Sequence, residues 1–238
     1  MPINIHRTSE LIETGSVKII VYSEAGFGKT TLCATAPDPF IISTESGLLS
    51  LKNFDLPYTP IHSLSELGEA YDHCVSSPHQ TICLDSISDI AETILVDNKK
   101  NYNDGRAAYG KLNDTMHEWI TKFRDIQNKH VYFTAKQGRF TDEYTGITSY
   151  GPMMPGKNNQ LNLPFYFDEL FCLRIGTLEN GETYRYLQTQ PDISYNAKDR
   201  SGELNLIERP DLSKIFAKIM RKREDDKKPK VKSADKEK

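Results

Sequence analysis

The sequence of 238 residues lacks the features that mark membrane, secreted or zinc-binding proteins. No apolar run approaches the roughly 20 residues that a membrane-spanning helix needs, and the first residues do not form a signal peptide. Only four cysteines occur, and they show neither C-x-x-C spacing nor a histidine pairing, which argues against zinc and for reduced thiols. The sequence therefore predicts a soluble, cytoplasmic protein without membrane contact.

Charge is nearly balanced overall but unevenly distributed. The formal net charge is −3. Residues 221–238 carry nine Lys or Arg and five Asp or Glu, which leaves 21 basic and 28 acidic residues in the remainder. With Pro229 and almost no apolar side chains, residues 221–238 are predicted to be a disordered charged tail. Such a tail either contacts nucleic acid electrostatically or only keeps the protein soluble.

A glycine-containing loop after the first apolar run is the strongest signal. Residues 17–22 are mostly apolar and β-branched, and residues 23–30 read SEAGFGKT before a predicted helix that begins at Lys29. This pattern predicts a phosphate-binding P-loop, in which backbone N–H groups and the helix N-terminus surround the phosphates. Lys29 then reaches the β and γ oxygens, and the Thr30 hydroxyl binds Mg²⁺. The residues predicted to bind ATP here are Ser23, Glu24, Ala25, Gly26, Phe27, Gly28, Lys29, Thr30 and Thr31.

Ser23 departs from the usual P-loop pattern, whose first position is glycine. A serine can leave a strand through an ordinary turn, so we expect weaker rather than abolished nucleotide binding. Gly26 and Gly28 let the backbone approach the phosphates without a Cβ atom between them.

Strands and helices alternate along the rest of the chain. Strands are predicted at residues 40–44, 58–61, 81–86, 131–135, 170–175 and 184–189, and helices at 63–76, 87–99, 106–128 and 212–220. This alternation predicts an α/β fold with a mostly parallel central sheet, helices on both faces and a C-terminal antiparallel extension. Residues 1–15 are a short lead, and residues 16–220 form the predicted core.

Asp85 ends the predicted strand 81–86 in the manner of a Walker B carboxylate. In a parallel sheet, the carboxyl end of this strand lies near the P-loop. Asp85 is therefore predicted to hold Mg²⁺ together with Thr30.

The order of these motifs resembles a RecA-type ATPase core. Residues 109–112 (YGKL), 133–135 (FTA) and 152–157 (PMMPGK) are similar to the small, core-only RecA-like ATPases encoded by phages. Over roughly residues 16–220, the resemblance implies a RecA-like P-loop NTPase that uses ATP in single-strand annealing or recombination, inside the infected host cell. It also implies a homo-oligomer of undetermined form, with a single-stranded DNA-binding protein as a further candidate partner.

Two polar residues match catalytic positions of the resembled family. Glu45 matches the glutamate that orients the attacking water, and a strand-end carboxylate beside the phosphates suits that role. A capping or solvated glutamate is the alternative. Gln137 matches the glutamine that senses the γ-phosphate, and the neighbouring Lys136 leaves this alignment open by one residue.

The resemblance places two single-stranded DNA-binding loops near residues 99–106 and 138–159. Cations for phosphates and aromatic rings for bases are the mixture that single strands need. Acidic residues lower the net positive charge of both loops. The alternative is therefore that these segments are solvated loops whose aromatic rings pack against the protein. Contact with the γ-phosphate of a neighbouring subunit is the alternative role for Lys157. The predicted DNA contacts are Lys99, Lys100, Arg106, Arg139, Phe140 and Lys157.

Three other functions fit a P-loop. A motor or loader of the AAA+ kind needs a C-terminal helical lid with an arginine finger, and only residues 212–220 follow the last strand as a predicted helix. A small-molecule kinase carries an arginine-rich lid, whereas residues 138–159 contain Arg139 alone. The third alternative is a non-enzymatic DNA-binding protein with a degenerate nucleotide site, because Ser23 replaces the first glycine of the P-loop pattern.

Overall fold

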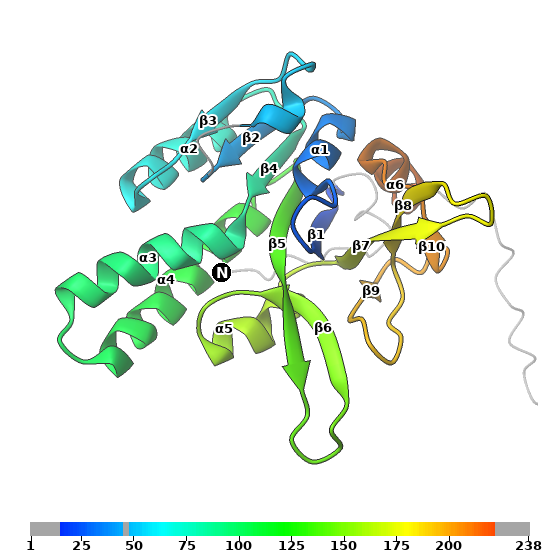
Figure 1. Ribbon diagram of the computed structural model, residues 1–238. Coiled ribbons are helices and arrows are strands. Elements are labelled where there is room, and N and C mark those ends of the chain that lie inside the picture. Colours follow the sequence, from blue (N-terminus) through cyan, green and yellow to red (C-terminus); the bar gives the residue numbers. More distant parts are fainter. Residues whose placement is uncertain (1–14, 45–47, 222–238) are drawn as a thin grey trace, which may run out of the picture.

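A ten-stranded sheet organises the part of the chain that the computed structural model describes, residues 15–44 and 48–221 (Figure 1). Its order is β10-β8-β7-β1-β5-β4-β2-β3, with β6 paired to β5 and β9 to β7. The strands are β1 Lys18–Ser23, β2 Pro39–Ser43, β3 Tyr58–Pro60, β4 Thr81–Asp85, β5 His130–Thr141, β6 Thr148–Met153, β7 Glu169–Thr177, β8 Thr183–Gln188, β9 Lys198–Asp199 and β10 Ile207–Glu208. The predicted lead and tail lie outside the described residues, except for residues 15 and 221.

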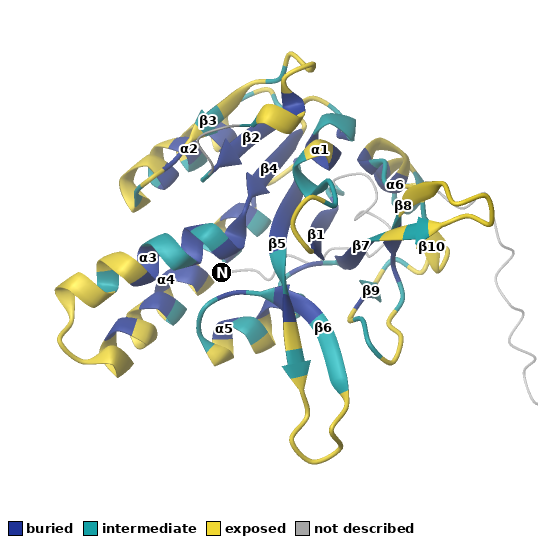
Figure 2. Ribbon diagram, in the orientation of Figure 1, coloured by how far each residue is buried: buried dark blue, intermediate teal, exposed yellow. Residues whose placement is uncertain are grey.

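Six neighbouring strands of the sheet run parallel to one another, in the spatial order β7-β1-β5-β4-β2-β3. Every residue of β1, β2 and β4 is buried, as expected for strands that are covered on both faces (Figure 2). The short β3 lies at the sheet edge, where Pro60 does not interrupt a central ladder. The predicted parallel α/β sheet is confirmed.

Helices cover both faces of this sheet (Figure 1). Residues of α2, α3 and α4 pack into one apolar cluster, and residues of α1 and α6 pack into a second cluster on the other face. In α4, Leu112, Met116 and Ile120 recur at helical spacing and are buried, whereas Tyr109 is exposed. The helices are α1 Lys29–Leu32, α2 Leu64–Ser76, α3 Ile87–Asn101, α4 Gly105–Arg124, α5 Lys157–Asn162 and α6 Leu212–Ile219.

The predicted C-terminal extension is present as antiparallel strands. β7 pairs with β8 and β8 pairs with β10, all antiparallel. Gly181 turns the chain between β7 and β8 with a φ of 85°, a conformation that glycine adopts without strain. Among the described residues, no helix has the length and apolar character needed to cross a membrane.

The predicted loop 138–159 is more ordered than its glycines and prolines suggest. β5 continues past Gln137 to Thr141 and pairs with β6 from Lys136↔Met153 to Thr141↔Thr148. The hairpin turns at Gly146, which has a φ of 69°. The carboxylate of Asp142 accepts N–H bonds from Tyr144 and Thr145 at 2.9 and 2.7 Å, which fixes the turn. A short helix that was not predicted, α5, follows.

Candidate functional site

The P-loop leaves β1 at Ser23 and enters α1 at Lys29. Gly26 and Gly28 have φ angles of 79° and 104°, in the region that glycine favours. The Lys29 ammonium group donates hydrogen bonds to the carbonyl and hydroxyl oxygens of Ser23 and to the Glu24 carbonyl, each 3.0 Å long. The lysine side chain therefore turns back across the loop, and all these groups lie on the wall of one cavity.

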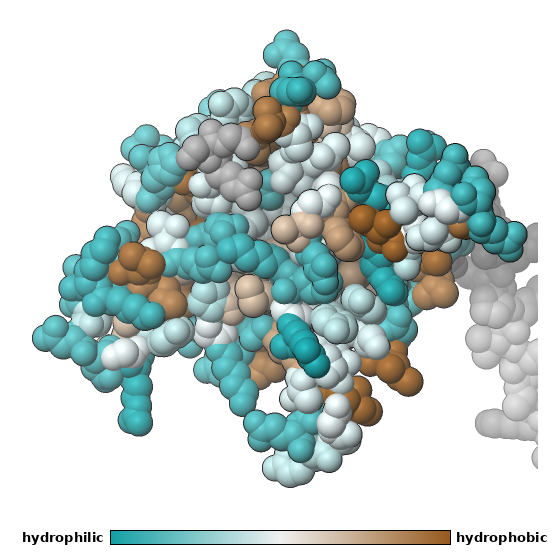
Figure 3. Space-filling model, in the orientation of Figure 1, coloured by the Kyte–Doolittle hydropathy of each residue, from teal (hydrophilic) through white to brown (hydrophobic). Residues whose placement is uncertain are grey.

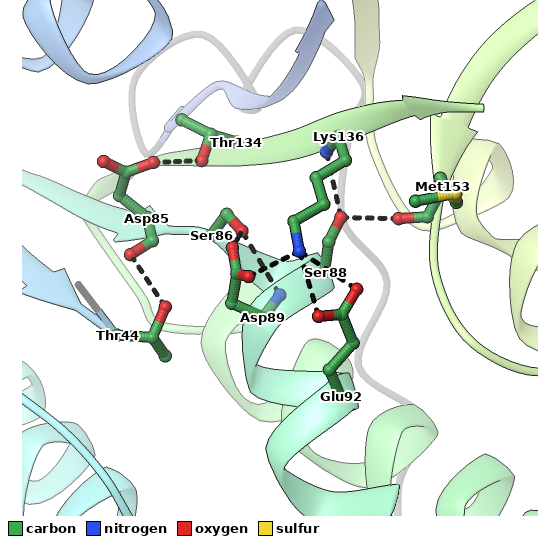
Figure 4. Close-up of polar contacts among 9 residues, drawn as sticks. All are labelled: Thr44, Asp85, Ser86, Ser88, Asp89, Glu92, Thr134, Lys136 and Met153. Carbon is green, nitrogen blue, oxygen red and sulfur yellow. Dashed lines mark hydrogen bonds and ion pairs between the residues drawn. The ribbon is translucent and has the colours of Figure 1, made fainter. Parts of the chain in front are cut away.

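Thr30 and Asp85 meet at the base of this cavity. The Thr30 hydroxyl donates to Asp85 Oδ2 over 2.6 Å. Asp85 is 4% exposed, and its other carboxylate oxygen accepts a hydrogen bond from the Thr134 hydroxyl of β5 (Figure 4). Because β5 lies between β1 and β4, this threonine holds the carboxylate in place from the intervening strand.

The cavity has a volume of about 1060 Å³ and lies at the carboxyl ends of the parallel strands, where ligands bind in open α/β sheets. Eight of the nine predicted P-loop residues line it. The exception is Phe27, whose ring packs against the apolar cluster beneath α1. Further lining residues come from β4, α3, β5 and the C-terminal extension, and include Asp85, Ser86, Asp89, Lys136, Gln137, Arg185 and Arg209.

Gln137 and Lys136 both reach the cavity, from consecutive positions of β5. The Gln137 amide donates to the Glu24 carboxylate over 3.3 Å. Lys136 instead pairs with Asp89 at 2.6 Å and Glu92 at 2.9 Å, both on α3 (Figure 4). Partial burial opposes the charge, but these hydrogen bonds and ion pairs raise the pKa of Lys136 above its ordinary value. Lys136 is therefore a fixed cation at the cavity edge.

Ser88 links the backbone of Lys136 to the hairpin. The Lys136 N–H donates to the Ser88 hydroxyl over 2.9 Å, and that hydroxyl donates to the carbonyl of Met153, over 2.5 Å (Figure 4). The cavity wall, the start of α3 and the base of the β5–β6 hairpin are thus connected by direct hydrogen bonds.

The residues predicted to bind DNA fall on two separate projections of the molecule (Figure 1). Lys99, Lys100 and Arg106 are exposed at the turn between α3 and α4. Hydrophilic side chains dominate this end of the molecule, and hydrophilic to neutral ones the hairpin tip (Figure 3). Lys100 pairs with Asp97 at 3.0 Å, and the Lys99 ammonium lies 5.7 Å from the Tyr109 ring centroid.

On the second projection, Arg139 is exposed on the hairpin. Lys157 lies outside the hairpin, exposed at the first position of α5. The Phe140 ring instead lies over two glycines, because Cβ atoms at Gly138 and Gly151 would stand 2.8 and 3.4 Å from it. Glu45 lies outside the described residues.

Sequence reasoning missed Thr134, the ion pairs of Lys136, and the two arginines Arg185 and Arg209. Lys136, Arg185 and Arg209 line the cavity, and Thr134 contacts Asp85, because of how distant segments pack together and not because of a local motif. The only available signal was the alternation of β8, which places Arg185 on the same face as the buried Leu187.

The oxygen donors at the cavity base fit Mg²⁺ bound together with a nucleotide. In residues 15–44 and 48–221, no group of three His, Cys, Asp or Glu side chains forms a metal site. Mg²⁺ keeps several waters and takes phosphate oxygens in addition to one or two protein oxygens. The hydroxyl of Thr30 and the carboxylate of Asp85 match this requirement.

These observations define a P-loop NTPase fold, with a mostly parallel sheet and an antiparallel C-terminal end. A family model described as an AAA domain matches residues 16–201. The chain therefore belongs to this AAA domain family.

Two solved structures are similar to the chain. One is a KaiC-like protein from Pyrococcus horikoshii OT3, with 16% identity, a TM-score of 0.40 and coverage of 76% of this chain and 83% of that one. The other is the flagellar accessory protein FlaH from Methanocaldococcus jannaschii, with 13% identity, a TM-score of 0.40 and coverage of 76% and 79%. No curated protein matches the chain.

Proposed function

We propose that this protein binds and hydrolyses Mg-ATP, binds single-stranded DNA, and promotes annealing or recombination in phage DNA metabolism. The observation that carries the nucleotide part is the contact between Thr30 and Asp85, 2.6 Å apart, at the base of a cavity whose rim holds Lys29. A hydroxyl, a carboxylate and an ammonium group in this arrangement match the needs of a Mg-triphosphate.

Hydrolysis at such a site depends on positioning and charge stabilisation. Lys29 exchanges its contacts with loop oxygens for the β and γ phosphate oxygens. Thr30 and Asp85 hold Mg²⁺, which neutralises charge that develops on the phosphates. Glu45 orients the attacking water, and Gln137, at the cavity wall, senses the γ-phosphate.

The DNA part of the proposal is supported by the course of β5. This strand begins in the buried sheet, passes the cavity at Lys136 and Gln137, and continues into the projecting hairpin with the exposed Arg139. A shift of Lys136 or Gln137 in response to the γ-phosphate would therefore move the hairpin, because both residues belong to the same strand. Lys99, Lys100, Arg106, Phe140 and Lys157 complete the proposed DNA contacts.

ATP hydrolysis measured with and without single-stranded DNA, over a series of salt concentrations, tests the proposal. We expect DNA to raise the hydrolysis rate and its affinity to fall steeply with salt, because phosphate contacts release counterions. Arg139→Ala should lower the slope of log affinity against log salt by about 0.7. Arg200→Ala is the matched control, since Arg200 pairs with Asp168 instead. A rate of ATP hydrolysis that does not change when DNA is added would contradict the proposed DNA binding but not the proposed ATP hydrolysis.

A motor or loader of the AAA+ kind is the second candidate, and the family description as an AAA domain favours it. Such an activity would require translocation or remodelling of a partner coupled to ATP. A strand-displacement assay separates it from annealing, because an annealing protein joins complementary strands and does not separate them. A small-molecule kinase would instead transfer phosphate to an acceptor other than water.

We further propose a homo-oligomer, and a single-stranded DNA-binding protein as a partner in the infected host cytoplasm. In the oligomer, contact with the γ-phosphate of a neighbouring subunit is the alternative to DNA contact for Lys157. The exposure of Lys157 at the start of α5 supports its contact with a neighbouring subunit. Lys157→Ala should then reduce hydrolysis while ATP binding is unchanged, and an unchanged rate would remove this role.

A further inference from the structure

Two arginines from the C-terminal part of the chain reach the P-loop cavity. Arg185 lies on β8, opposite Ile175 of β7. Its side chain projects to the same face of the sheet as Leu187, which packs with Leu32 and Cys33 at the end of α1. Arg209 lies between β10 and α6. Both arginines line the cavity that the P-loop lines.

Arg185 lies directly against the P-loop. A Cβ atom at Gly28 would stand 3.3 Å from Nε of Arg185 and 3.9 Å from its Cζ. Gly28 immediately precedes Lys29, so the guanidinium group and the ammonium group border the same stretch of backbone. Because Gly28 has no Cβ atom, the Arg185 side chain has room to approach the P-loop backbone this closely.

Arg209 is held near the P-loop helix by its neighbours. The Leu212 N–H donates to the Thr35 hydroxyl over 2.9 Å, and the Ser213 hydroxyl donates to the Thr35 carbonyl over 2.5 Å. Thr35 closes the helical turn that follows α1. These bonds fasten the start of α6, and with it the segment that carries Arg209, to the end of the P-loop helix.

The two arginines differ from the other cations of the cavity in having no partner among the described residues. Lys29 donates to three loop oxygens, and Lys136 is paired with Asp89 and Glu92. In the part of the chain that the structure describes, neither the Arg185 nor the Arg209 guanidinium has a hydrogen-bond or ion-pair partner. Two uncompensated guanidinium groups beside a phosphate-binding loop are complementary to an anionic ligand.

We propose that Arg185 and Arg209 bind the phosphate chain of the nucleotide in the same chain that supplies the P-loop. Guanidinium groups bind phosphate oxygens through paired, charge-assisted hydrogen bonds. The antiparallel extension and α6 then close the nucleotide site from the side opposite β4. This inference rests on the proposed nucleotide binding, and it goes beyond it by assigning a binding role to the C-terminal strands.

Affinity measurements with ATP, ADP and adenosine test this inference. Arg185→Gln should weaken ATP binding roughly 10- to 100-fold, because hydrogen bonds to charged groups are among the strongest that proteins make. Arg209→Gln should weaken ATP binding in the same direction, and adenosine binding should be unchanged in both. Arg185→Lys should recover only part of the loss, since lysine lacks the planar fork of donors. Arg200→Gln serves as the matched control away from the cavity.

Mixing two variants that each bind ATP weakly or not at all shows whether Arg185 acts on the site of its own chain or on that of a neighbouring chain. If Arg185 served a neighbouring subunit, a mixture of Lys29→Ala and Arg185→Gln would rebuild complete sites and regain ATP binding and hydrolysis. We expect no recovery, because each site needs both residues from one chain. Recovery in the mixture would overturn the proposal.

The failure of this inference is distinguishable from failure of the proposed function. If wild type binds ATP, Lys29→Ala does not, and Arg185→Gln binds as well as wild type, the arginine proposal alone is wrong. If wild type shows no affinity for ATP, both proposals are wrong. Circular dichroism and the midpoint of urea unfolding establish that the exposed substitutions leave the fold intact.

Discussion

The hydroxyl of Thr30 and the carboxylate of Asp85 are in hydrogen-bond contact although 55 residues separate them in the chain. The two residues belong to the P-loop helix and to β4, and β5 lies between β4 and the P-loop strand. Because all three strands are parallel, their carboxyl ends share one edge of the sheet. The contact is therefore a consequence of sheet order, and the Thr134 hydroxyl of β5 stabilises it from below.

Asp85→Asn should lower Mg-dependent ATP hydrolysis by about 100-fold, the usual effect of removing one group that stabilises transition-state charge. The neutral amide keeps the shape of the side chain but loses the charge that attracts Mg²⁺. The Mg²⁺ concentration for half-maximal rate should rise as well. Asp114→Asn, on the exposed surface of α4, is the control. A variant with the Mg²⁺ dependence of wild type would contradict the assignment.

Ser23→Gly should strengthen ATP binding by roughly 2- to 10-fold, the equivalent of one ordinary hydrogen bond. Ser23 is buried, and its hydroxyl accepts a hydrogen bond from Lys29 over 3.0 Å. Removing that acceptor releases Lys29 toward phosphate. Titration with ATP measures the change, and Ser23→Ala separates loss of the hydroxyl from loss of Cβ. Weaker binding in both variants would show that the serine supports the loop.

Local sequence patterns were sufficient for the sheet and the P-loop but not for the rest of the cavity. The apolar runs before Ser23 and Asp85 predict buried strands whose polar ends meet in a parallel sheet. Gly138 and Pro152 suggested a loop, although the backbone pairs across the hairpin at both positions. The alternation of β8 indicates only which face of the sheet Arg185 is on. Its approach to Gly28 depends on the sheet order, in which β7 lies between β8 and β1.

His130 should make the free energy of unfolding depend on pH. Its ring stacks on Phe216 with centroids 3.9 Å apart, and its Nδ1 accepts the Val17 N–H over 3.0 Å. Burial, with a smaller contribution from the positive charge of Lys18, lowers the pKa of His130 to about 4. The unfolded chain has the ordinary histidine pKa of roughly 6.5. The stabilisation by neutral His130 is therefore complete above about pH 6.5 and is lost as the pH falls toward 4.

Urea unfolding at pH 7 and pH 4.5 measures this dependence. The part due to His130 should be on the order of 2 kcal/mol, with allowance for the partial exposure of the ring. His130→Phe keeps an aromatic ring against Phe216 but cannot be protonated. The variant should be less stable at pH 7, where Val17 loses its acceptor, and should lose less stability on acidification. An equal loss in both proteins would exclude His130 as the source.

Lys136→Met should weaken ATP binding by roughly 3- to 10-fold, because like charges repel and anionic phosphates would then meet unpaired carboxylates. Lys136 compensates Asp89 and Glu92 at the cavity edge. The triple variant Lys136→Met with Asp89→Asn and Glu92→Gln removes these charges together and should recover most of the ATP affinity. Calorimetric titration with ATP and with adenosine checks both steps, and adenosine should bind all three proteins alike. If the triple variant remains as weak as the single one, Lys136 contacts the nucleotide itself.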